Sequence, residues 1–216
     1  MNLPKAIALL LLVTGTAAVV AQTRTLAPQY WDLMTWEVRS FLGMTQYAMV
    51  TLDSESVLQA DADASASALY REQSIDLDDT PYLHWRWRTD STLGTNIDET
   101  RKSGDDYVAR LYVVRSGGFA FWRTKALNYV WASNQATGSR WDNPFAGDNV
   151  QMLAVDSGSA HIGQWRHHVR DVKADWLAAF GESIDNLDGI AIMTDTDNSG
   201  AQARSWYADV RFSQRR

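Results

Sequence analysis

Apolar and polar residues alternate along most of this chain in short runs, and a period of two is the pattern of a half-buried β-strand. Turn-prone positions such as Gly43 and the pair Gly117-Gly118 separate the runs. The predicted strands are 37–42, 46–52, 56–62, 66–75, 82–88, 105–114, 125–132, 149–155, 164–169, 189–194 and 204–212. A long polar segment, 133–147, interrupts them and is predicted to be a loop.

One segment has the period of a helix instead. Val172, Trp176 and Phe180 recur at every fourth position, Asp171 stands where a helix begins and Gly181 where it ends. About ten strands with regular turns and one short helix predict an all-β fold, a single β-sandwich of the jelly-roll kind. A closed up-and-down barrel is the competing architecture.

The first residues have the form of a secretory signal peptide. Lys5 precedes an uncharged apolar run, 6–21, that ends in the small residue Ala21. An uncleaved membrane anchor is the alternative, but the run is shorter than the roughly 20 residues that a spanning helix needs. We therefore expect a signal peptide over 1–21, a leader or linker over 22–35, and one β-sandwich domain over 36–216.

Charge and cysteine content narrow the class of protein. The chain has a net charge of −6, and removing 1–21 with Lys5 makes it −7. An acidic chain without a basic stripe is not expected to bind nucleic acid or to stay inserted in a membrane after cleavage. The sequence has no cysteine, which excludes disulfides and a lipoprotein with a lipid-modified cysteine. We expect a periplasmic or secreted protein.

The most informative run is Tyr82–Arg88. On a strand it places Trp85 and Trp87 on one face and Arg86 and Arg88 on the other.

We expect this run to lie beside 105–114. There the alternation places Tyr107, together with Leu111, opposite Asp106, Arg110 and Tyr112. Together the two runs would form one polar sheet face. The candidate ligand-binding residues are Arg86, Arg88, Asp106, Arg110 and Tyr112 as its floor, with Trp131 and Trp141 as an aromatic rim.

This polar face has two interpretations. Buried charges must pair, so Asp106 could simply neutralise Arg86 or Arg110 inside the protein. Alternatively, Arg86 and Arg88 near a single carboxylate leave spare cationic capacity, and arginine forks suit anionic groups.

A metal site is a separate hypothesis. The segment 195–200 reads D-x-D-x-S-G, and oxygen ligands at alternate positions can converge on calcium. Asp195, Asp197 and Ser199 are the candidate ligands of a structural calcium ion. The twelfth position is Trp206 rather than glutamate, so the segment is not an EF-hand. An acid-rich turn that binds no ion is the alternative.

Four separated blocks resemble a known family. They are His84–Arg88, Gly104–Val114, Asn128–Trp131 and Ile192–Asn198. In this order they are similar to a bacterial exported domain-of-unknown-function family, number 3047, over about 36–212. The resemblance implies a galactose-binding-like β-sandwich, an architecture shared with many carbohydrate-binding modules, and no settled activity.

Three functions remain open. The first is non-catalytic binding of a glycan or another polar or anionic ligand on the polar face. The second is a lyase-like enzyme, in which Arg86 or Arg88 neutralises a uronate and Tyr112 or His84 moves the proton. The chain lacks the Gln/His pair expected beside that arginine. The third is a structural or partner protein of the cell envelope whose charges are only paired with one another.

Overall fold

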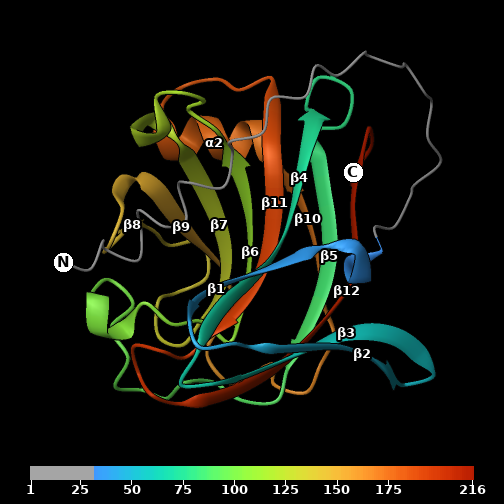
Figure 1. The fold of residues 1–216 in the computed structure, drawn as a ribbon, viewed down its shortest axis with the longest axis vertical. Coiled ribbons are helices and arrows are strands. Elements are labelled where there is room, and N and C mark those ends of the chain that lie inside the picture. Colours follow the sequence, from blue (N-terminus) through green and yellow to red (C-terminus); the bar gives the residue numbers. More distant parts are fainter. Residues whose placement is uncertain (1–31) are drawn as a thin grey trace.

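The computed structural model describes residues 32–216, which form two β-sheets packed face to face (Figure 1). The prediction of an all-β sandwich with one short helix is confirmed, and the described strands do not close into a single barrel. The predicted signal peptide and most of the predicted leader lie outside the described residues.

The larger sheet has seven strands in the order β1-β4-β11-β6-β7-β9-β8. Neighbours run antiparallel except for the parallel pair β7 and β9. The strands are β1 (Glu37–Leu42), β4 (Ala66–Asp76), β11 (Asn186–Asp195), β6 (Ala109–Arg115), β7 (Lys125–Ala132), β9 (Gly147–Ser157) and β8 (Arg140–Asn143).

The smaller sheet has five antiparallel strands in the order β10-β5-β12-β3-β2. They are β10 (Arg166–Asp171), β5 (Tyr82–Thr89), β12 (Gln202–Ser213), β3 (Glu55–Asp63) and β2 (Gln46–Leu52). Three short 3-10 helices complete the description: η1 (Leu33–Thr35), η2 (Lys102–Gly104) and η3 (Phe121–Arg123).

The predicted helix is α2 (Val172–Phe180), which lies at one end of the sandwich (Figure 1). The side chain of Asp171 caps it by accepting the N–H of Ala174 at 3.0 Å. Gly181 ends it in the left-handed conformation, with φ 70°, which a glycine adopts without a steric penalty. Within 32–216, no helix is both long enough and apolar enough to cross a membrane.

Two sequence predictions about the strands were wrong. The segment 133–147 is not a continuous loop, because it contains β8, which pairs with β9. The runs 82–88 and 105–114 are not neighbours: β5 pairs with β10 and β12, whereas β6 pairs with β11 and β7 in the other sheet. Alternation assigns the two faces of each strand but says nothing about which strands pair.

The core between the sheets is rich in aromatic side chains. Trp85, Trp87 and Trp131 are almost completely buried there, and the rings of Trp85 and Trp87 meet edge to face at 5.4 Å. Their strands come from both sheets, so these rings bury the inner faces of β5 and β7 against each other.

A buried carboxylate also links the two sheets. Asp156 on β9 accepts hydrogen bonds from the indole of Trp87 at 2.7 Å and from Arg166 at 2.9 Å, and it pairs with His168 at 2.6 Å. Burial alone would raise the pKa of Asp156, but the hydrogen bonds from His168, Trp87 and Arg166 outweigh it and lower that pKa.

We expect Asp156→Asn to lower the melting temperature at neutral pH. A carboxyl whose pKa is depressed by folding stabilises the protein above its unfolded pKa, about 4, and loses that contribution as the pH falls through the folded pKa. The difference between variant and wild type should therefore narrow below about pH 4. Asp79→Asn, at an exposed carboxyl, is the control, and a difference that stays constant across the pH series would contradict the assignment.

Candidate functional site

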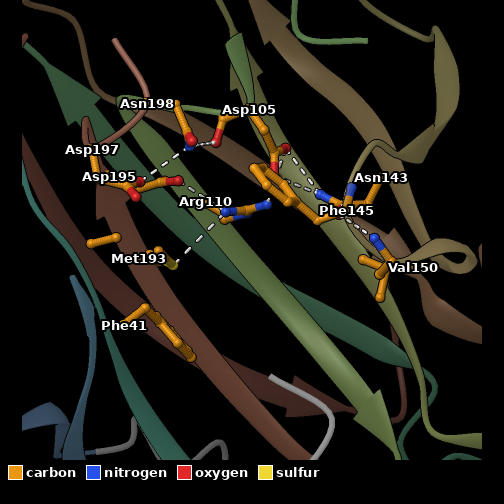
Figure 2. A pocket seen from close by; sticks show the side chains of 12 residues that line it. Phe41, Asp105, Arg110, Asn143, Phe145, Val150, Met193, Asp195, Asp197 and Asn198 are labelled. Atoms are coloured by element: carbon orange, nitrogen blue, oxygen red, sulfur yellow. Dashed lines mark hydrogen bonds and ion pairs between the residues drawn. The ribbon is translucent and has the colours of Figure 1, made fainter. Parts of the chain in front are cut away.

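A pocket opens on the outer face of the seven-stranded sheet, where β6 begins and β11 ends (Figure 2). The space between its walls, including the part open to solvent, is about 490 Å³. The lining residues are Phe41, Ala66, Asp105, Arg110, Asn143, Phe145, Ala146, Val150, Met193, Asp195, Asp197 and Asn198.

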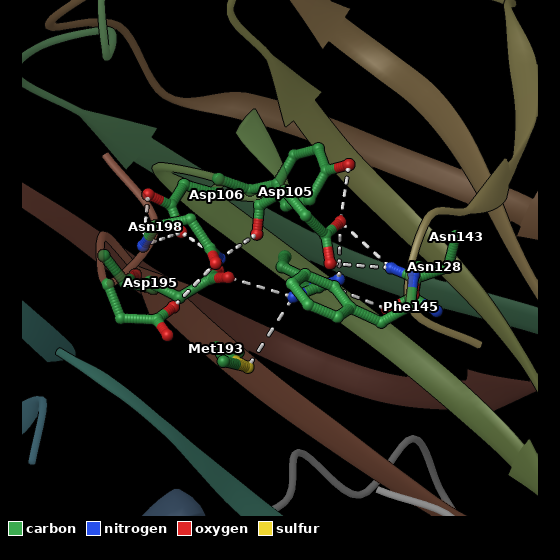
Figure 3. A network of polar contacts seen from close by, with 12 residues as sticks. Asp105, Asp106, Asn128, Asn143, Phe145, Met193, Asp195 and Asn198 are labelled. Atoms are coloured by element: carbon green, nitrogen blue, oxygen red, sulfur yellow. Dashed lines mark hydrogen bonds and ion pairs between the residues drawn. The ribbon is translucent and has the colours of Figure 1, made fainter. Parts of the chain in front are cut away.

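Arg110 lies at the centre of this pocket and is 6% exposed. Its guanidinium donates to Asp195 Oδ2 at 3.0 Å and to Asn128 Oδ1 at 3.1 Å, and it lies 3.7 Å from Asp105 Oδ1 (Figure 3). It also stacks on the ring of Tyr107 at 4.7 Å. The guanidinium is therefore fixed by contacts with side chains from two other strands, β7 and β11, and from the loop before β6.

Asp105 connects Arg110 to the far wall of the pocket. Its carboxylate accepts two hydrogen bonds from the amide of Asn143, at 2.8 and 2.9 Å, and one from the hydroxyl of Tyr107 at 3.2 Å. The other amide atom of Asn143, Oδ1, accepts the backbone N–H groups of Phe145 and Ala146 at 3.0 Å each. These bonds hold the short turn between β8 and β9 against the pocket.

Asp106 holds the turn that follows β11. Its carboxylate accepts the backbone N–H of Asn198 at 3.1 Å and of Ser199 at 2.6 Å, and the amide of Asn198 at 3.0 Å. Because these donors belong to residues 198 and 199, Asp106 fixes the acid-rich turn beside Arg110.

Negative charge exceeds positive charge in this region. The carboxyls of Asp105 and Asp195 face the guanidinium of Arg110, and those of Asp106 and Asp197 lie close enough to Asp195 to raise its pKa. Burial raises the pKa of Asp195, the neighbouring carboxylates raise it further, and Arg110 opposes both effects. Burial likewise raises the pKa of Asp105.

Three of these acids also have the geometry of a cation site. One carboxylate oxygen from each of Asp106, Asp195 and Asp197 lies within 4.8 Å of the others. Asp195 Oδ1 is buried and makes no hydrogen bond with any residue of 32–216. The Ser199 hydroxyl, predicted to be a ligand, instead contacts the backbone of Thr196 and Ala201. Carboxylate oxygens are suitable ligands for a hard divalent ion.

The structure divides the predicted polar face between opposite sides of the sandwich. Arg86 and Arg88 lie on the outer face of the five-stranded sheet, away from Arg110. Arg86 pairs with Glu55 and Asp209, and it stacks on the ring of Trp165.

Arg88 pairs with Asp53 at 3.0 Å. The expected arrangement of two arginines facing a single carboxylate is therefore wrong, and so is a lyase site that combines them with Tyr112. Each arginine has an acidic partner of its own on that face.

The other predicted residues are distributed between core and site. Tyr112 shares the outer face of β6 with Arg110 but is fully buried. Trp131 is fully buried between the sheets and donates to Gly158 O at 3.0 Å, so it forms no rim. Trp141 is half-buried and packs against Tyr107 beside the pocket, with ring centres 6.5 Å apart.

The alternation also misplaced Tyr107. The strand begins only at Ala109, so the irregular segment before it reverses the phase: Tyr107 faces outward to Arg110, and Val108 packs into the core. Sequence reasoning also missed Asp105, Asn143 and Asn198. Two of these, Asp105 and Asn198, belong to the blocks 104–114 and 192–198 that resemble the known family, and this resemblance was the one signal that could have pointed to them.

Comparison with known proteins identifies a family and distant structural neighbours. The family model described as "Protein of unknown function (DUF3047)" matches residues 34–211. No curated protein matches this chain.

Three solved structures illustrate the neighbours. A structure of TmCBM61 in complex with β-1,4-galactotriose has 10% identity and a TM-score of 0.39, covering 85% of this chain and 91% of that one. The SGBP-B protein from a xyloglucan utilisation locus in Bacteroides uniformis has 13% identity and a TM-score of 0.36, covering 81% and 47%. An exo-β-agarase has 9% identity and a TM-score of 0.34, covering 83% and 24%.

We expect Arg110→Met to destabilise the protein strongly. The substitution leaves Asp105 and Asp195 buried without their cation, a change that typically costs about 3–5 kcal/mol. Denaturant unfolding measures the loss. Adding Asp195→Asn should restore part of the free energy of unfolding, because it removes one stranded carboxylate. A double variant no more stable than Arg110→Met would show that the ion pair is not the source of the loss.

Proposed function

We propose that this chain, which belongs to the DUF3047 family, binds a neutral carbohydrate in the pocket beside Arg110. The observation that supports this function most directly is that planar hydrogen-bonding side chains and aromatic rings line the same pocket (Figure 2). Sugar rings present hydroxyl pairs at their edges and C–H groups on their faces, so their recognition needs both kinds of group.

The polar wall suits hydroxyl groups. Asp105, Asp197 and Asn198 offer acceptors, while Asn143 and Arg110 add N–H groups that their neighbours already hold in place. Side chains fixed in this way lose little conformational entropy when a ligand arrives.

The apolar wall suits the face of a sugar ring. Phe41 on β1 and Phe145 after β8 line the pocket together with Val150 and Met193. Rings on the side of a pocket provide a contact surface that requires no polar partner.

The charge of the pocket favours a neutral ligand over an acidic one. Three carboxyls, those of Asp105, Asp195 and Asp197, line the pocket with a single guanidinium, and that guanidinium is already bound by Asp195 and Asp105. A uronate or sulfated sugar would add negative charge next to these acids, which is unfavourable.

We expect a glycan array to show binding to neutral glycans, and Phe41→Ala to weaken binding of the best of them about tenfold in calorimetry, a loss of about 1.4 kcal/mol. Phe121→Ala, which removes an exposed ring outside the pocket, is the matched control and should leave the affinity unchanged. An array that detects only acidic glycans, or equal losses in both variants, would contradict the proposal.

We also propose that calcium binds Asp106, Asp195 and Asp197. A divalent ion would offset the repulsion among these carboxylates and provide a partner for Asp195 Oδ1. The ion would then fix the turn 195–200, which supplies Asp197 and Asn198 to the carbohydrate pocket.

Calcium should raise the melting temperature, because an ion that binds only the folded state at 100 times its Kd adds about 2.7 kcal/mol of stability. Asp197→Asn should remove most of this response. Asp79→Asn, at an exposed acid in the loop before β5, should keep it. Melting curves that are identical with calcium and with a chelator would rule out the site.

A further inference from the structure

A second cleft lies at the open edge of the sandwich. It is lined by residues from β8 and β9 of one sheet, from β10 of the other, and from α2, and the space between them, including the part open to solvent, is about 610 Å³. β8 and β10 are each the last strand of their sheet, so neither has a neighbour beyond it to close this edge.

The strand β10 brings a row of basic side chains to this edge. Arg166, His168 and Arg170 alternate with outward residues and therefore share one face of the strand. Arg166 and His168 both contact Asp156, as described above. Arg170 forms a two-bond ion pair with Asp175 of α2, one bond of which is 2.7 Å long.

Both acids at this edge are thus already engaged. Asp175 accepts, besides Arg170, the hydroxyl of Tyr129 at 3.0 Å. Asp156 is fully enclosed by Trp87, Arg166 and His168.

One cation in the cleft lacks a partner. Arg140 on β8 lines the cleft, is exposed, and forms no ion pair with any residue of 32–216. Two arginines, Arg140 and Arg170, therefore line the cleft beside a single carboxylate, that of Asp175, and Thr137 lies in the same cleft. This charge balance is the opposite of that in the pocket beside Arg110.

We propose that this cleft binds an oxyanion group, the carboxylate, sulfate or phosphate of a small ligand, with Arg140 as its principal contact. A guanidinium presents a planar fork of N–H donors that matches such a group. Arg170, held in place by Asp175, supplies a second positive charge on the facing strand, and Thr137 a further hydrogen bond.

The cleft is independent of the carbohydrate pocket. Leu153 and Val155, which line the cleft, belong to the core between the sheets, whereas Val150 and Asn143 line the pocket on the outer face. The two proposals therefore stand or fall separately, and a substitution of Arg140 leaves the pocket intact.

The test is a titration of the full chain with inorganic phosphate and, separately, with glucuronate, at constant ionic strength. Binding is followed by NMR shifts of the Trp87 indole N–H, which contacts Asp156, and of the His168 ring. Both probes carry an oxyanion, and a response to only one of them identifies the source that the cleft accepts. Glucose, a neutral sugar, should not shift these signals.

Arg140→Gln should weaken oxyanion binding at least about tenfold, since it removes both the positive charge and the fork of N–H donors. The affinity of Arg140→Lys, which keeps the charge but loses the planar fork of N–H donors, should lie between the affinities of Arg140→Gln and of wild type. Arg123→Gln, at another exposed arginine without an ion pair in the described chain, should bind as wild type. No saturable shift with either probe, or equal losses in Arg140→Gln and Arg123→Gln, would overturn the proposal.

Discussion

The buried guanidinium of Arg110 is the group on which the candidate site depends. A charge with 6% exposure requires partners, and Arg110 finds them in Asp195, Asp105 and Asn128 (Figure 3). Burial alone would lower the pKa of Arg110, but Asp195 and Asp105 outweigh burial and raise it, so the side chain stays charged. Segments that are far apart in the sequence meet at this one charge.

Two carboxylates beside this charge, those of Asp105 and Asp106, also fix the turns that border the pocket. Asp105 fixes Asn143 and with it the β8–β9 turn, while Asp106 fixes the turn after β11. Because both turns are held by buried carboxylates, they do not move independently. Carbohydrate sites benefit from such rigidity because each sugar hydroxyl contributes little on its own.

Much of the fold could be predicted from the sequence because strand alternation and helix signals are local. The faces of Trp85 and Trp87, and the bounds of the helix between Asp171 and Gly181, follow from neighbours in the chain. Strand pairing is not local, and for this reason β5 was wrongly placed beside β6. Hydrophobic alternation is the same whichever strand lies alongside.

The candidate site was predicted in part for the same reason. Arg110 and Asp106 were recognised because they lie in or just before a strand with a clear pattern. Asp105 and Asn143 were not predicted as site residues because they lie at irregular positions, where the direction of a side chain depends on a turn. Trp131 shows the reverse error, since an aromatic residue beside a long loop proved to be part of the core.

Acidic and basic side chains gather in two separate regions, which the overall net charge does not show. The net charge of −6 concealed an acidic pocket on one sheet face and a cationic cleft at the sandwich edge. A protein with both can contact a neutral ring in one place and an oxyanion in another. A single polar face that binds one anionic ligand would not show this separation of acidic and basic regions.

The most direct test of the central claim is an NMR map of the full chain with its tightest-binding neutral glycan. If the pocket beside Arg110 is the site, the side-chain amides of Asn143 and Asn198 and the Nε–H of Arg110 should shift and saturate together. The Nε–H signals of Arg86 and Arg88, on the opposite sheet, should stay in place. Shifts at Arg86 and Arg88 without any at Asn143 would contradict the account and move the binding site to the other face.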